Sequence, residues 1–196
     1  MIRNTSWRKN LLLAAVLALA LPAARAAEFN QMQLAKSSLS FISKQMNVPV
    51  EGSFKSFRST LVFDPAKPAA ARAELEIDMA SIDAGSKDAN DEVAGKDWFN
   101  TRAFPTARFE STSVKPLGGN RFEIAGKMTI KGRTLDLSTP VTVTQQGNSA
   151  SFDGSLVLKR ADYAIGDGVW ADFGTVANEI QIKFRLVATA STAAAK

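Results

Sequence analysis

Apolar and polar side chains alternate residue by residue along several stretches of this chain. The clearest stretch, residues 72–79, has one apolar and one ionic set: Ala73, Leu75, Ile77 and Met79 against Arg72, Glu74, Glu76 and Asp78. A period of two puts these sets on opposite faces of a β-strand. The ranges 122–130, 135–143 and 180–186 follow the same pattern. These stretches therefore predict amphipathic strands, each with one buried and one solvated face.

Less regular stretches bring the number of predicted strands to eight: 38–46, 50–63, 107–114 and 150–159. Residues typical of turns lie between the strands, at 47–49, 64–68, 118–120, 132–133 and 147–148. Eight amphipathic antiparallel strands can form a sandwich or a closed barrel, and closure removes the exposed sheet edges. The interior of an eight-stranded barrel is either filled by side chains or holds one small ligand.

The segment 88–96 departs from this β pattern and predicts a short helix. Asp88 can cap its first turn, and Asp91 and Glu92 complement the positive end of the helix dipole. Gly95 is a suitable terminator. The predicted fold is therefore all-β with one short helix.

The start of the chain has the features of a secretory signal peptide. A positively charged region precedes an apolar run of eleven residues at 11–21, and residues 24–26 read Ala-Arg-Ala, a small-x-small cleavage site. Eleven apolar residues are fewer than the roughly 17–25 that a bilayer crossing needs. The predicted organisation is a signal peptide at 1–26, cleaved after Ala26, a β-barrel domain at 27–190 and a frayed tail at 191–196.

Charge and composition exclude several classes of function. Without the four basic residues of the leader, 20 basic side chains face 19 acidic ones, so the mature chain has no basic field for nucleic acid. Cysteine and histidine are both absent, which removes thiol chemistry, Ser-His arrangements and the commonest metal ligand. We therefore expect no catalytic residue, no metal and no cofactor.

The acidic residues suggest little chemistry of their own. Asp83, Asp88, Asp91 and Glu92 do not have the spacing of a calcium-binding loop, and acids in the first turn of a helix are common. A carboxylate-dependent enzyme would have to use Asp83, Asp162 or Asp167, and nothing fixes a second acid at a catalytic distance. Gly166-Asp167-Gly168 is typical of a flexible loop.

A small outer-membrane barrel is an alternative, because such proteins are also exported and have eight strands. The outward set Glu74, Glu76 and Asp78 argues against it, because each of these charges would face hydrocarbon.

The predicted inner faces are rich in phenylalanine and methionine, which suits both a filled core and an apolar cavity. The polar groups predicted to point inward are few and neutral: Ser43, Gln45, Ser111 and Ser113. Six aromatic residues fall in or beside irregular segments, where they could cap the barrel or form its mouth: Trp98, Phe99, Phe104, Tyr163, Trp170 and Phe173.

Several motifs in the same order resemble the YceI-like family of polyisoprenoid-binding proteins. They cover 37–41 with 50–57, 81–85, 98–99, 104–112, 126–134 and 160–166. The last of these has the pattern Arg-x-Asp-aromatic-x-Ile-Gly. Lys36 and Gln45 stand where many members have histidines, so recognition of a head group by imidazole is not carried over.

The resemblance implies an eight-stranded, lipocalin-like antiparallel barrel with a long internal tunnel. The implied function is a non-catalytic periplasmic carrier that holds an isoprenoid of the quinone or polyprenol type, or a similar amphiphilic lipid. A membrane contact during lipid exchange and a homodimer are both compatible with it. The predicted ligand-binding residues are Leu39, Phe41, Phe54, Phe57, Phe63, Leu75, Ile77, Met79, Phe104, Phe109, Phe122, Ile124, Met128, Ile130, Leu135, Phe152, Leu156, Tyr163, Ile165, Trp170, Ile182 and Phe184.

Overall fold

The structure is a computed structural model that describes residues 27–191. The predicted signal peptide at 1–26 and almost all of the predicted tail lie outside the described residues. One antiparallel sheet with the strand order β4-β5-β7-β8-β9-β10-β11-β2-β3-β6 dominates the fold, and β1 pairs with β11. The strands are β1 Phe29–Met32, β2 Ser38–Gln45, β3 Val48–Phe54, β4 Phe57–Val62, β5 Arg72–Asp78, β6 Ile82–Asp83, β7 Thr106–Gly118, β8 Arg121–Ile130, β9 Arg133–Gln146, β10 Ser149–Lys159 and β11 Glu179–Ala190.

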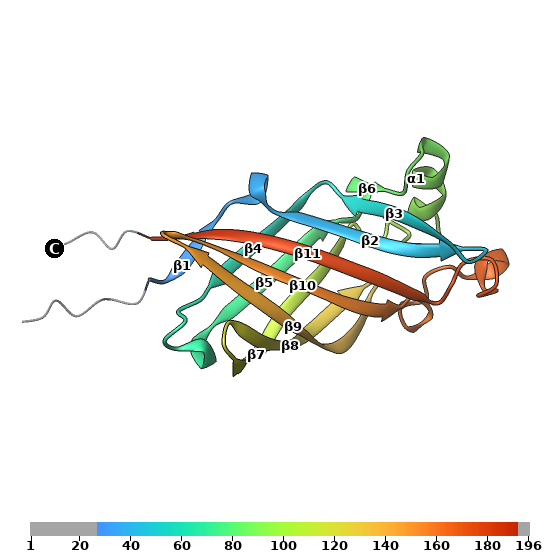
Figure 1. The fold of residues 1–196 in the computed structure, drawn as a ribbon. Helices are drawn as coiled ribbons and strands as arrows, with labels where there is room; N and C mark the ends of the chain where they lie inside the picture. Colours follow the sequence, from blue (N-terminus) through green and yellow to red (C-terminus); the bar gives the residue numbers. More distant parts are fainter. Residues whose placement is uncertain (1–26, 192–196) are drawn as a thin grey trace, which may run out of the picture.

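The sheet curls on itself, so that its two sides approach each other (Figure 1). At one end β1 joins β11 to the end of β4, where Phe29 and Phe63 exchange two backbone hydrogen bonds of 2.9 and 3.1 Å. Further along, β3 continues into β4 through the two residues Lys55 and Ser56. The predicted all-β, lipocalin-like barrel class is confirmed.

The strand count differs from the predicted eight for local reasons. The predicted strand 50–63 is divided at Lys55 and Ser56 into β3 and β4, where the backbone leaves the ladder with β2 and enters the ladder with β5. The strands β1 and β6 were not predicted, because four and two residues are too short for an alternation to stand out. The other seven predicted strands correspond to β2, β5 and β7–β11.

Two hairpin turns begin one residue earlier than predicted. The turn between β8 and β9 uses Lys131 and Gly132, with φ of 49° and 75°, and the turn between β2 and β3 uses Met46 and Asn47, with φ of 44° and 65°. Two successive positive φ values are the geometry of a type I′ turn, whose twist matches that of paired strands. These turns therefore fix the register of the hairpins that they join.

The helix α1, Lys87–Ala94, occupies most of the segment predicted to be helical. The prediction that Asp88 caps it is wrong: the cap is Ser86, whose hydroxyl accepts a hydrogen bond of 3.2 Å from the backbone N–H of Ala89. Serine is as good an N-cap as aspartate. Asp88 instead lies in the first turn, and Gly95 ends the helix as predicted. Short 3₁₀ helices occupy η1 Leu34–Lys36, η2 Pro68–Ala70, η3 Met79–Ser81, η4 Arg160–Tyr163 and η5 Gly168–Trp170.

The interior divides into two halves along the barrel axis. We call the end that carries β1 and the end of β11 the terminal end, and the end that carries α1, η4 and η5 the helical end (Figure 1). The terminal half is filled by a closely packed cluster: Phe29, Leu61, Phe63, Ala71, Val114, Phe122, Val141, Val143, Ala150, Phe152, Ala188 and Ala190. At its centre the ring of Phe63 meets those of Phe122 and Phe152 edge to face, each at 5.2 Å. This half is a solid core, and Leu61, Val141 and Phe152 form its face toward the other half.

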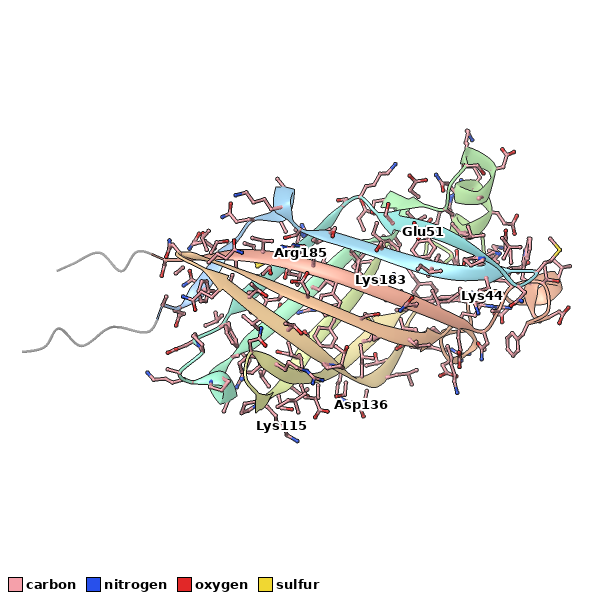
Figure 2. All side chains as sticks on the ribbon, viewed as in Figure 1. Lys44, Glu51, Lys115, Asp136, Lys183 and Arg185 are labelled. Carbon is pink, nitrogen blue, oxygen red and sulfur yellow. The ribbon has the colours of Figure 1, made fainter. Side chains whose placement is uncertain are left out.

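The outer faces of the strands carry the charged side chains that the alternation predicted. Lys44, Glu51, Lys183 and Arg185 project away from the barrel (Figure 2). Cross-strand ion pairs between exposed groups, such as Lys127 with Asp136 at 2.9 Å, add little stability each. None of the helices between residues 27 and 191 has the length and apolar character that a bilayer crossing requires.

Candidate functional site: an apolar cavity in the helical half

A cavity of about 490 Å³ occupies the helical half of the barrel. Its volume lies within the range of pockets that bind small molecules. Inward-facing side chains of the strands form its sides, and α1, η4 and η5 contribute to its wall at the helical end. A second apolar cluster surrounds it: Leu39, Ile77, Met79, Trp98, Ala107, Met128, Ile130, Tyr163, Ile165 and Val176.

Most of the residues predicted to bind a ligand line this cavity. They are Leu39, Phe41, Phe54, Leu75, Ile77, Met79, Phe109, Ile124, Met128, Ile130, Phe152, Leu156, Tyr163, Ile165, Trp170, Ile182 and Phe184. They come from β2, β3, β5, β7, β8, β10, β11 and three irregular segments. The fold therefore brings together apolar residues that are far apart in the sequence.

Five predicted residues lie elsewhere. Phe63 and Phe122 belong to the solid core of the terminal half. Phe57 packs against the second cluster without lining the cavity. The ring of Phe104 covers Gly132 of the β8–β9 turn, and Leu135, near that turn, is 38% exposed. Alternation tells which face of a strand a residue occupies but not how far along the barrel it lies, which is why the four strand residues were included. Phe104 was included as an aromatic residue of an irregular segment.

The cavity also has lining residues that the sequence prediction did not name. The same alternation extends to Leu137, Leu158 and Ile180, so these could have been found. Ala89 and Val93 are four residues apart on α1 and therefore share one helix face. Val50 shares the alternation of Phe54 on β3 and could also have been found. Ile82 and Val176 lie in short or irregular segments, where no periodicity marks them.

Six polar residues contribute to the lining: Ser43, Gln45, Ser59, Glu74, Glu92 and Thr139. Ser43 and Gln45 of β2 line it, on the inner face that their alternation predicted. Thr139 is buried, and its hydroxyl donates to the carbonyl of Ser155 at 3.1 Å. The hydroxyl of Ser111, also predicted to point inward, accepts a hydrogen bond of 2.8 Å from the backbone N–H of Ala73 and is not part of the lining.

A buried arginine organises the loop that closes the helical end. Arg160 is 2% exposed, and its guanidinium donates to five backbone carbonyls: those of Ile165, Gly166, Trp170 and Val176 at 2.6–2.9 Å and that of Ala177 at 3.3 Å. Burial lowers its pKa from the ordinary value, and the nearby charge of Asp167 opposes that shift. Arginine remains charged in proteins, so these bonds are charge-assisted. Arg160 therefore holds the segment 160–176 in one conformation.

A lysine and the loop aromatics complete this closure. The ammonium of Lys131 donates to the carbonyls of Lys96 and Ala164 at 3.0 and 2.5 Å, which joins the β8–β9 turn to both loops. The rings of Trp98 and Trp170 lie 5.5 Å apart. The Trp170 Nε1–H donates to the Glu92 carboxylate at 2.7 Å, so a hydrogen bond links η5 to α1. These contacts make the helical end an ordered cap.

The loop aromatics divide into three groups in the structure. Trp98, Phe99, Tyr163 and Trp170 line the cavity, and the first and third are buried. Burial raises the pKa of Tyr163, and the charge of Asp162 adds to this, so its phenol stays neutral. Phe104 packs on the β8–β9 turn, and Phe173 is 48% exposed.

The carboxylates have structural partners. The Asp83 carboxylate pairs with the Lys55 ammonium at 2.7 Å. Hydrogen bonds from Lys55 and from the Gly85 backbone N–H hold its pKa below the ordinary value. Asp91 pairs with Lys87 one turn earlier in α1. Among residues 27–191, no three or more acidic side chains converge in a way that could hold a metal ion.

A curled antiparallel sheet around an apolar cavity defines a lipocalin-like barrel. The YceI-like domain matches residues 31–188, and the chain belongs to this family. BcnA of Burkholderia cenocepacia is 51% identical, with a TM-score of 0.79 over 81% of this chain and 100% of that one. A UPF0312 protein of Azotobacter vinelandii is 29% identical over 137 residues, which are 67% of this chain and 69% of the relative.

More distant structures show the same fold. The YCEI protein of Campylobacter jejuni is 19% identical, with a TM-score of 0.66 over 72% of this chain and 85% of that one. A structure described as a polyisoprenoid binding domain from Saccharophagus degradans, implicated in plant cell wall breakdown, is 17% identical. It has a TM-score of 0.66 over 85% of this chain and 99% of that one. The fold is therefore shared well beyond the range of close sequence similarity.

Proposed function

We propose that the mature chain is a non-catalytic periplasmic carrier that holds an isoprenoid lipid of the quinone or polyprenol type in the cavity of its helical half. The observation that carries this proposal is a preformed cavity whose walls are almost wholly apolar. The polyisoprenoid-binding domain of Saccharophagus degradans, which has this fold, supports the ligand class. The signal-peptide pattern of residues 1–26 supports export.

An apolar tail suits this cavity for an energetic reason. Moving apolar surface out of water stabilises a complex by roughly 25 cal/mol per Å². A charged ligand would lose its hydration against walls that offer few hydrogen bonds in return. The lining therefore favours a long hydrocarbon chain over a charged metabolite.

Three of the neutral polar groups lie toward the helical end, where we place the head of the ligand. Ser43 and Gln45 line the cavity close to the β2–β3 turn. The buried Nε1–H of Trp98 has no hydrogen-bond partner within residues 27–191. Neutral donors favour an uncharged head that can accept hydrogen bonds, such as a quinone carbonyl or an alcohol oxygen. The tail then points toward the solid core.

We also propose that the helical end touches a membrane while lipid is exchanged. Four apolar residues of two loops are exposed there: Met46 at 77%, Val48 at 61%, Val169 at 83% and Phe173 at 48%. The loops lie side by side, because the Met46 backbone N–H donates to the Thr175 carbonyl at 2.9 Å. A substitution of Val169 and Met46 by Ser should slow lipid transfer between vesicles and leave affinity in solution unchanged. Equal transfer rates would contradict a membrane contact.

The outward charges support a carrier over an outer-membrane barrel. On β5, Glu74 and Asp78 are exposed, and a barrel that spans a bilayer would place them against hydrocarbon. Of the acids that an enzyme would have to use, Asp83 pairs with the Lys55 ammonium at 2.7 Å, and Asp167 lies 3.9 Å from the Lys131 ammonium.

Intrinsic fluorescence tests the proposal directly. The chain has three tryptophans, one of them Trp7 in the predicted leader, and the other two, Trp98 and Trp170, both line the cavity. Titration of the mature protein with a long-chain quinone should quench this fluorescence saturably, and a polyprenol should compete. Leu75→Gln, which puts an amide into the cavity, should weaken binding, whereas Glu76→Gln on the outer face of the same strand should not. Absence of saturable quenching and competition would overturn the proposal.

A further inference from the structure

Three phenylalanines of the cavity wall lie over glycines of the neighbouring strand. Phe41 pairs with Gly52 across β2 and β3, and Phe184 pairs with Gly154 across β11 and β10. A Cβ built on either glycine would lie only 2.2 Å from the Cζ of the facing ring. The rings therefore occupy the space that a side chain would take.

Phe109 lies over Gly126 of β8 in the same way, with its Cζ 2.5 Å from a Cβ built there. All three rings line the cavity, whereas the glycines beneath them do not. A ring that lies against the wall leaves the centre of the barrel free. The glycines thus allow large aromatic residues to line the barrel without filling it.

Phe184 has a special position among these rings. It packs both against the solid core of the terminal half and against the cluster that surrounds the cavity. Its ring therefore lies between the two clusters, and the cavity continues beyond it to Phe152 and Leu186, which pair with each other. Gly154 pairs with Phe184 on one side and with Val141 on the other, so these three residues lie at one level of the barrel. Val141 belongs to the solid core.

Gly154 is the glycine at which a substitution acts on the ring alone. The three atoms nearest to a Cβ at Gly154 all belong to the Phe184 ring, at 2.2, 2.7 and 2.9 Å. A Cβ at Gly52 or Gly126 would also meet a backbone carbonyl oxygen, at 2.6 and 2.3 Å. A methyl group at Gly154 must therefore displace the end of one flexible side chain, and the free space beside it is the cavity.

We propose that the Phe184 ring, held flat on Gly154, keeps the deepest part of the cavity accessible and thereby sets the length of lipid tail that the protein accepts. This inference rests on the proposed function and deepens it, because it names the residues that select among isoprenoids. In Gly154→Ala the ring turns into the cavity and shortens it. In Phe184→Ala the ring is absent, and the cavity widens at the level below which Phe152 and Leu186 line its deepest part.

A series of isoprenoid alcohols tests the inference: farnesol, geranylgeraniol and solanesol, in order of increasing length. Affinity is measured by displacement of a quinone that quenches Trp98 and Trp170. Gly154→Ala should lower the affinity for solanesol on the order of tenfold or more and change the affinity for farnesol by less than about twofold. Small steric changes in apolar pockets have effects of this size. Phe184→Ala should shift the preference toward solanesol.

The control variants separate a change of depth from general damage. Phe57→Ala removes an equivalent ring that does not line the cavity, and it should leave the order of the three affinities unchanged. On the Phe184→Ala background, Gly154→Ala should have no further effect, because the ring that it displaces is gone. If the wild type binds none of the alcohols, the proposed function fails. If it binds them and both variants keep the wild-type order of affinities, the depth inference fails while the proposed function stands.

Discussion

The two halves of the barrel interior are lined by similar apolar side chains but are packed differently. In the terminal half, β1 brings Phe29, which is fully buried, against the end of β4, and three phenylalanine rings meet edge to face. In the helical half, rings lie on glycines, and the loops that close the end are held by hydrogen bonds to Arg160 and Lys131. Apolar side chains are therefore enough to form the interior of the barrel, whereas the placement of glycines and closing segments decides whether that interior is filled or hollow.

Loss of a ring should cost far more stability in the terminal half than in the helical half. Phe63→Ala should lower the free energy of unfolding by about 3–5 kcal/mol, because the ring is 3% exposed and tightly surrounded. Phe41→Ala should lower it by about 1–2 kcal/mol, since that ring is only partly buried and already borders empty space. Urea denaturation of the two mature variants measures both values. Equal losses would show that the halves are not packed differently.

Removal of the Arg160 guanidinium should loosen the helical end. Arg160→Leu leaves the five backbone carbonyls that accept from Arg160 without these donors, and unsatisfied buried groups cost about 1–3 kcal/mol each before relaxation. We expect the free energy of unfolding to fall by about 2–3 kcal/mol. Hydrogen exchange should become faster in 160–176 and stay unchanged in β1. Arg133→Leu is the control, because its exposed guanidinium donates to one carbonyl, that of Asp162 at 3.3 Å. If hydrogen exchange in 160–176 is as slow in Arg160→Leu as in Arg133→Leu, Arg160 does not hold this segment in one conformation.

The hydrogen bond between α1 and η5 should affect how fast a ligand leaves. Glu92→Ala removes the acceptor of the Trp170 Nε1–H, a contact worth about 0.5–1.5 kcal/mol. Release of bound quinone, followed by recovery of fluorescence, should become about two- to tenfold faster. Asp91→Ala removes the neighbouring acid, which pairs with Lys87 on the outer face of α1 and does not line the cavity, and it should leave the rate unchanged.

The smallest effect concerns the stability of the fold in acid and involves Asp83, where β3 pairs with β6. Folding lowers the pKa of Asp83 below 3.8, so its ionised form stabilises the fold above that pH and the contribution disappears as the pH falls through the lowered pKa. Asp83→Asn should therefore be slightly less stable than the wild type near neutral pH and equal to it in strong acid. A pH series of thermal melts checks this. A difference that grows toward acid pH would reverse the assigned sign.

The sequence was most informative where a strand is long enough for its alternation to be visible. The charged and apolar faces of β5 and β11 could be predicted residue by residue, and so could the end of α1 at Gly95. It could not distinguish Phe63, in the solid core, from Phe41, on the cavity wall, because both occupy the inner face of a strand. The position of a residue along the barrel axis depends on the pairing register and on β1, and the four residues of β1 are too few to show an alternation.

The cap at the helical end was predictable only in part. The motif at 160–166 is one of those that carry the resemblance to the family, but its arginine donates to carbonyls as far along the chain as Ala177. Such contacts follow from the path of a loop, which has no periodicity to read. The role of the glycines under Phe41 and Phe184 could not be predicted either, because it depends on the residue that faces each glycine in the next strand.

The mass of whatever co-purifies with the mature protein tests the central claim most directly. Native mass spectrometry of protein exported by its bacterial host and purified without detergent should show an adduct with the mass of an isoprenoid quinone or polyprenol. The adduct should be lost from Leu75→Gln and retained by Glu76→Gln. A mature protein that is free of ligand, and that takes up neither quinones nor polyprenols on incubation, would contradict the claim that the hollow half of this barrel carries lipid.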